Sequence, residues 1–76
     1  MLLVYADGAS LGYVCSGTYQ INRTVRRVVT GGWGGYFTWV NSKGEHPQRQ
    51  FCDHETITGA WYTLSITLAA TKPGWC

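Results

Sequence analysis

The stretch AWYTLSITLAA, residues 60–70, alternates between two sets of side chains from residue 61 to residue 68. Its even positions carry the apolar residues Tyr62, Leu64, Ile66 and Leu68. Its odd positions carry Trp61, Thr63, Ser65 and Thr67. A period of two is typical of a β-strand that buries one face. We therefore expect a strand here, with the odd positions, Trp61 included, on the side that faces solvent.

A second strand is expected over residues 11–22, LGYVCSGTYQIN, where apolar side chains again take alternate positions. Shorter segments rich in β-branched or aromatic residues are further candidates: 2–6, 24–30, 36–40 and 49–55. Asp7-Gly8 suits a tight turn that would pair 2–6 with 11–22. Other turns are expected at 31–32, 41–44, 46–47, 58–59 and 72–74. Because no segment has a helical period, we expect an all-β fold, a small antiparallel β-sandwich or barrel of about five strands stabilised by a disulfide.

The composition points to one β-rich domain spanning residues 1–76. Charged residues make up only 13% of the chain, and the net charge is +2 with the basic residues scattered. This argues against nucleic acid as a partner, since nucleic-acid binding calls for a clustered basic surface. No apolar run reaches the roughly 18 residues of a membrane span. The bias toward glycine, threonine, tyrosine and tryptophan favours a secreted, extracellular module, with a cytosolic protein as the alternative.

The three cysteines, Cys15, Cys52 and Cys76, can form only one intramolecular bridge and leave one thiol over. We favour Cys15–Cys52, because Cys15 falls on the apolar face of the strand expected at 11–22. Cys52–Cys76 is nearly as well supported, since it would hold the end of the chain in place. Three reduced thiols would fit the cytosolic alternative.

The stretch FCDHE, residues 51–55, is the main cluster of chemically capable side chains, and His46 lies nearby. Cys52 and His54 would share a strand face and could bind zinc or act as a nucleophile pair. The paired spacings typical of structural zinc sites are missing, and so small a chain can hardly enclose a catalytic pocket. We expect no enzyme activity, no metal and no cofactor.

Arg26 and Arg27 are neighbours inside the segment expected at 24–30. In a regular strand one guanidinium would point into the core, so the pair predicts an edge strand or a local twist. Recognition of an acidic partner is an alternative explanation of the pair.

The stretch TGGWGGYFTW, residues 30–39, combines four glycines with four aromatic rings. The chain holds more large rings than two short strand faces can bury, so some must look outward. We expect Trp33, Tyr36 and Trp61 to form a ligand-binding surface and Trp39 to pack mainly in the core. The alternative is that these rings only cover the ends of the sheet.

These features favour a small secreted binding module that recognises a glycan or a protein surface through exposed tryptophan and tyrosine. One alternative is a secreted enzyme inhibitor or an antibacterial or toxin-like effector that inserts the turn at 31–35 or 41–47 into a target. Another is a structural subunit that self-associates into a homo-oligomer, because low charge eases pairing of strand edges.

Overall fold

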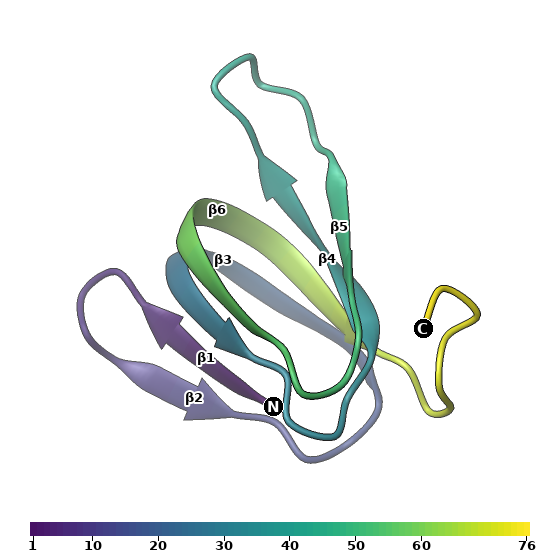
Figure 1. Cartoon of the computed structure of the whole chain (residues 1–76). Helices are drawn as coiled ribbons and strands as arrows, with labels where there is room; N and C mark the ends of the chain where they lie inside the picture. The colour runs from purple at the N-terminus through teal and green to yellow at the C-terminus, as the bar shows by residue number, and fades with distance from the viewer.

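The computed structural model describes residues 1–76 and consists of strands and turns. The strands are β1 (Leu2–Tyr5), β2 (Ser10–Gly12), β3 (Gly17–Val29), β4 (Gly35–Val40), β5 (Gln48–Phe51) and β6 (Thr56–Leu68). They form one six-stranded antiparallel sheet in the order β2-β1-β3-β6-β4-β5 (Figure 1). The all-β prediction is confirmed. A closed barrel is not formed, and a two-sheet sandwich is also wrong, because β2 and β5 remain free edges of a single sheet.

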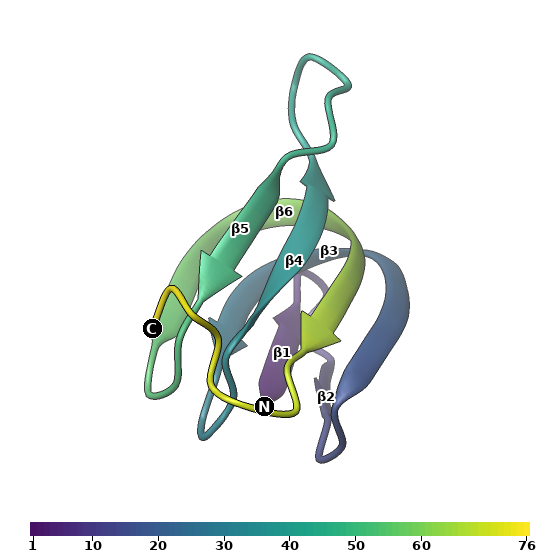
Figure 2. The same cartoon turned by 90° about the vertical axis from the view of Figure 1, so that its right-hand side faces the viewer.

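Two long strands take the place of a second sheet. β3 and β6 have 13 residues each, pair with each other and curve strongly, so that the sheet curls around its own inner face (Figure 2). The strands predicted at 11–22 and 24–30 have different bounds in the structure. The first predicted segment is interrupted, because β2 ends at Gly12 and β3 begins at Gly17. The second is joined to the first, because β3 continues through residue 22 to Val29. Likewise, the turn predicted at 58–59 lies inside β6. No helix of the structure is long and apolar enough to cross a membrane.

Two β-bulges bend the long strands. In the first, Ile21 and Asn22 of β3 lie opposite Leu64 alone, and Asn22 has a φ of 52°. Asparagine is among the residues that tolerate this left-handed conformation best. In the second, Arg26 lies opposite Gly59 and Ala60 of β6. Bulges of this kind bend a strand and increase its twist, which accounts for the curl of the sheet.

The core lies on the inner face of the curled sheet. Its buried members are Leu3, Tyr5, Ile21, Val25, Val28, Phe37, Phe51, Ile57, Ile66 and Leu68. The register between β4 and β6 shifts at Leu64, which exchanges the two faces of β6 at that point. Thr63 is consequently buried and Trp61 packs against the core, while Tyr62 is exposed. The predicted apolar face of 60–70 is thus correct at its C-terminal end and reversed at its N-terminal end.

The hairpin predicted at Asp7-Gly8 is confirmed, since β1 and β2 pair around this turn. Asp7 Oδ1 accepts a hydrogen bond from the Ala9 N–H at 3.0 Å, and Asp7 Oδ2 lies 2.9 Å from Arg23 Nη2. The Ala9 N–H, assisted by the Arg23 guanidinium, holds the pKa of Asp7 below its ordinary value. The Arg23 guanidinium also lies over the Tyr5 ring, 3.8 Å from its centroid.

Tyr13 makes the stability of the fold depend on pH in the alkaline range. Its ring lies 4.5 Å from that of Tyr19, and burial, with a hydrogen bond to Tyr5, raises the pKa of Tyr13 to about 12. Because the folded state keeps this phenol neutral above its ordinary pKa of 10.0, Tyr13 stabilises the fold fully below that pH and loses the contribution as pH rises toward 12. We expect the urea midpoint to fall less steeply across this window in Tyr13→Phe than in the wild type. The exposed Tyr62→Phe serves as control, and equal slopes in all three proteins would contradict the assignment.

The disulfide joins Cys52 to Cys76, with the sulfur atoms 2.01 Å apart. The favoured pairing Cys15–Cys52 is therefore wrong and its alternative is correct. Cys15 is exposed and free, in the connection between β2 and β3. The strand order explains the error, because β2 and β5 form opposite edges of the sheet and keep Cys15 away from Cys52.

Candidate binding surface

The outer face of the sheet carries two rows of uncharged polar side chains. Across β5, β4, β6 and β3, the register aligns Gln50, Tyr36, Thr67 and Thr18 in one row and Gln48, Thr38, Ser65 and Gln20 in the other. We call these eight residues the outer polar band. All eight are exposed or half-buried. The residues between the two rows include the buried Phe37 and Ile66, so alternation along the strands sends the band outward.

The outer polar band offers hydroxyl and amide groups without a formal charge. Thr18 Oγ1 and Thr67 Oγ1 lie 2.9 Å apart and hydrogen bond across β3 and β6. Amide and hydroxyl groups both donate and accept hydrogen bonds. The surface can therefore match a ligand that presents hydroxyl groups of its own.

An aromatic pair joins this band to the C-terminal tail. The rings of Tyr36 and Trp75 meet edge to face, with their centroids 6.5 Å apart. Trp75 Nε1 donates a hydrogen bond to the Phe51 carbonyl oxygen at 3.2 Å, yet 44% of the tryptophan stays exposed. This arrangement leaves an amphipathic ring open to a ligand while its polar end is satisfied.

The C-terminal tail is held against the sheet by contacts with two loops. It runs past the start of β4 toward β5 (Figure 2), and the Ala69 N–H bonds the Gly34 carbonyl. The bridge to Cys52 fixes its last residue. The loop that carries Cys52 is fixed in turn, because the fully buried Thr30 donates through Oγ1 to the Cys52 carbonyl at 2.8 Å. Trp75 is thus positioned by residues that are distant in sequence.

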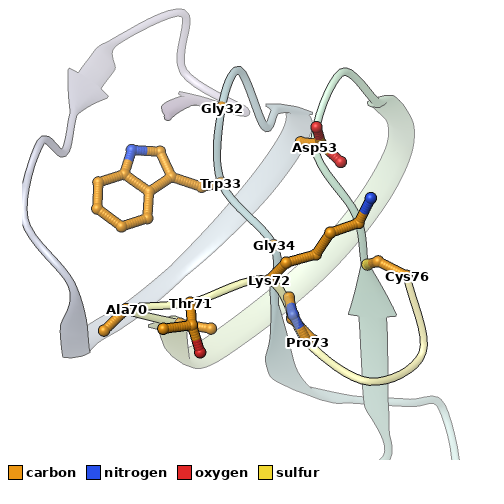
Figure 3. Close-up of a pocket in the computed structure, with 10 residues that line it drawn as sticks. Gly32, Trp33, Gly34, Asp53, Ala70, Thr71, Lys72, Pro73 and Cys76 are labelled. Atoms are coloured by element: carbon orange, nitrogen blue, oxygen red, sulfur yellow. The ribbon is translucent and has the colours of Figure 1, made fainter.

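Trp33, the first ring expected at the surface, is half-buried and packs against the core. It also lines a pocket of about 140 Å³ beside the tail, together with Asp53 and Lys72. In Figure 3 its indole extends to one side of the segment 32–34, and the Lys72 side chain lies on the other side. Trp33 therefore contributes to the support of the loop more than to an open surface.

Trp61, another of the expected surface rings, lies on the inner face. It meets the buried Phe37 ring edge on, with centroids 5.6 Å apart. The expectation that Trp61 faces solvent is wrong, because the bulge at Leu64 reverses the alternation of β6. Trp39 packs against the core, as expected. Trp33, Tyr36 and Trp61 do not form one surface, and of the three only Tyr36 belongs to the outer polar band.

The exposed rings that the sequence did not assign to a site are Trp75 and Tyr62. Trp75 could have been found from the alternative pairing Cys52–Cys76, which places residue 75 beside the end of β5. Tyr62 could not, because its outward position depends on the bulge at Leu64.

The cluster at 51–55 performs a structural role. Cys52 is bridged, and its N–H donates to Glu55 Oε1 at 2.6 Å. His54 Nε2 lies 3.4 Å from Asp53 Oδ2. No three histidine, cysteine or carboxylate side chains gather in a way that could hold a metal ion.

The loop at 41–47 projects from the body of the molecule at the tip of the β4–β5 hairpin (Figure 1). Asn41 shapes it: Asn41 Oδ1 accepts from the N–H groups of Lys43 and Glu45, both at 2.9 Å. Insertion of this loop into a target enzyme stays an untested prediction.

Comparisons of the chain with protein-family models, with curated proteins and with solved structures found no match.

Proposed function

We propose that this protein is a secreted, non-enzymatic binding module that holds a glycan on the outer polar band, beside Tyr36 and Trp75. The observation that carries the proposal is the band itself, eight uncharged polar side chains in register, one of which, Tyr36, contacts the exposed ring of Trp75. Sugar hydroxyls would exchange hydrogen bonds with the amides and hydroxyls. The apolar face of a sugar ring would pack on Trp75.

The composition of this surface favours a glycan over a protein partner. Protein interfaces usually have a desolvated apolar or aromatic centre surrounded by a polar rim. Here the arrangement differs, because uncharged polar side chains make up most of the surface, and its aromatic groups are limited to Tyr36, inside one row, and Trp75 against it. The disulfide between Cys52 and Cys76 supports the secreted location, since such bonds persist mainly in oxidising compartments.

Truncating either ring of the pair is expected to weaken glycan binding by about tenfold or more, because a single aromatic hot spot contributes about 2 kcal/mol. Tyr36→Ala and Trp75→Ala should be measured by titration calorimetry against the strongest ligand of a glycan array. Thermal melts of both variants should show a folded protein, as the rings lie on the outer face. Val14→Ala, which shortens an 85% exposed side chain in the connection between β2 and β3 that is not part of the band, is the control.

Unchanged affinity in both ring variants would contradict the proposal. So would a wild-type protein that binds no glycan of the array while gel filtration shows it to be monomeric and its band therefore uncovered.

A further inference from the structure

Arg26 and Arg27 are both exposed although they are adjacent in β3, an interior strand of the sheet. The register explains this. Arg26 has no partner in β1, where Val4 and Tyr5 pair with Arg27 and Val25. On the other side of β3, Arg26 lies opposite the Gly59-Ala60 bulge of β6. The flanking residues Val25 and Val28 are both buried. The bulge therefore places both guanidinium groups on the outer side of the sheet, where a regular strand would have turned one inward.

The arginine pair continues the same face that carries the outer polar band. Tyr62, which is 46% exposed, pairs with Thr24 of β3. Arg26 follows Thr24 by two residues, a distance of about 7 Å along a strand. Thr67 of the band lies five residues from Tyr62 along β6, about 16 Å. The outer face thus runs from Trp75 through the band to Tyr62 and ends at two cations.

Every carboxylate side chain of the protein is engaged elsewhere. These side chains belong to Asp7, Glu45, Asp53 and Glu55. Asp7 pairs with Arg23, and Asp53 lies beside His54. Glu55 accepts a hydrogen bond from the Cys52 N–H, and Glu45 accepts one from the Asn41 side-chain amide in the projecting loop. Arg26 and Arg27 consequently have no acidic partner within the protein.

We infer that the glycan bound on the outer face is acidic and that its carboxylate or sulfate groups contact Arg26 and Arg27. This inference rests on the proposed function and adds the class of ligand. A guanidinium forms bidentate, charge-assisted hydrogen bonds with planar or tetrahedral oxyanions, and two adjacent guanidinium groups raise both strength and selectivity. The length of the face calls for an oligosaccharide rather than a single sugar.

A single-stranded nucleic acid is less well matched to this face. Such ligands are held in a continuous basic groove that follows the phosphate backbone. The outer polar band has no basic residue over its two rows, and the net charge of the chain is only +2. An acidic glycan needs cations only where its acid groups lie.

The test compares ligands that differ in charge but not in sugar. Polygalacturonate is measured against its methyl ester, and dextran sulfate against dextran, by titration calorimetry at low and high salt. The wild type is expected to bind at least one acidic form about tenfold or more tightly than its neutral counterpart, as a lost charged hydrogen bond costs about 1.5 kcal/mol. The pair that shows the preference identifies carboxylate or sulfate. Added salt should reduce the preference.

Arg26→Gln/Arg27→Gln is expected to bind the acidic and neutral forms about equally. Lys43→Gln/Arg49→Gln removes the same formal charge from the β4–β5 hairpin and should keep the preference. Equal loss in both double variants would overturn the inference, because the preference would then follow net charge. The comparison of acid with ester in the wild type is decisive even if a variant fails to fold.

The remaining outcomes separate this inference from the proposed function. A wild type that binds acidic and neutral forms equally overturns the inference and leaves the glycan-binding function standing. A wild type that binds none of these polysaccharides overturns the inference, and the proposed function falls with it only if no glycan of the array binds either. A wild type that binds a single-stranded oligonucleotide more tightly than any glycan overturns both.

Discussion

Gly35→Ala is expected to destabilise the protein by about 3 kcal/mol or more, the upper range of effects from overfilling a packed site. A Cβ on Gly35 would overlap the carbonyl oxygen of Thr67 in β6 and lie 3.2 Å from the Phe51 ring. The first of these neighbours is backbone in a paired strand, so neither rotamer change nor side-chain movement can relieve the overlap. β4 would have to separate from β6. A domain of this size has a total stability of roughly 4 to 11 kcal/mol, so the change removes a large part of it.

Urea unfolding of Gly35→Ala and Gly32→Ala tests this with one substitution at two nearby positions. A Cβ on Gly32 would meet no atom within 4 Å, and Gly32 has no positive φ. Its replacement should change stability by less than about 0.5 kcal/mol, as is usual for exposed positions. Similar unfolding curves for the two variants would show that β4 and β6 do not approach as closely as the structure has them.

The same contact explains why one of the glycines at 30–39 directly precedes a ring. Gly35 lets β4 lie close against β6, and the rings that follow then alternate between the two faces. Tyr36 points outward to the band, and Phe37 points inward to the core. The alternation of this short segment was visible in the sequence, because β4 has no extra residue of its own.

The strands themselves were largely predictable, and their faces only in part. Periodicity and β-branched residues located β1, β4 and most of β6, and Asp7-Gly8 located the first hairpin. A period of two holds only while the register is unbroken, and each bulge exchanges the faces beyond it. Asn22 and Gly59 mark two of these bulges, but in a sequence they are indistinguishable from turn residues. Both Trp61 and Tyr62 were therefore assigned to the wrong face.

The arginine pair shows the same limit with a different outcome. Two adjacent arginines correctly indicated that β3 could not be a regular half-buried strand. The sequence left two explanations open, an edge strand and a local twist. β3 is an interior strand, and a β-bulge at Arg26 provides the local distortion. The chemistry of this part of the outer face follows from that choice, because an edge position would have left one arginine pointing inward.

The disulfide could not be assigned because connectivity depends on strand order. β5 pairs with β4 at one edge of the sheet, and β2 lies at the other edge. Nothing local to Cys15, Cys52 or Cys76 encodes that separation. The bridge that forms closes a loop between residues 24 positions apart and fixes the tail that carries Trp75.

Removing this bridge is expected to lower the free energy of unfolding by about 3 kcal/mol, from the chain entropy that the cross-link removes from the unfolded state. Cys52→Ser/Cys76→Ser, measured by urea unfolding, is compared with Cys15→Ser, which changes the exposed free thiol and should leave stability unchanged. Equal stability of the wild type and the two variants would contradict a structural role for the bridge.

The double variant also separates the contribution of the bridge to folding from its contribution to the proposed site. Without Cys52–Cys76, the Trp75 ring is held to the sheet by its hydrogen bond to Phe51 and its edge contact with Tyr36. The hydrogen bond is only partly buried, 44% of Trp75 is exposed, and one neutral hydrogen bond contributes only about 1 kcal/mol. The tail should therefore detach much of the time, and glycan affinity should fall toward that of Trp75→Ala even where the sheet remains folded. If the double variant stays folded and binds as tightly as the wild type, Trp75 is not the ring on which the glycan packs, and the outer polar band must bind it through Tyr36 alone.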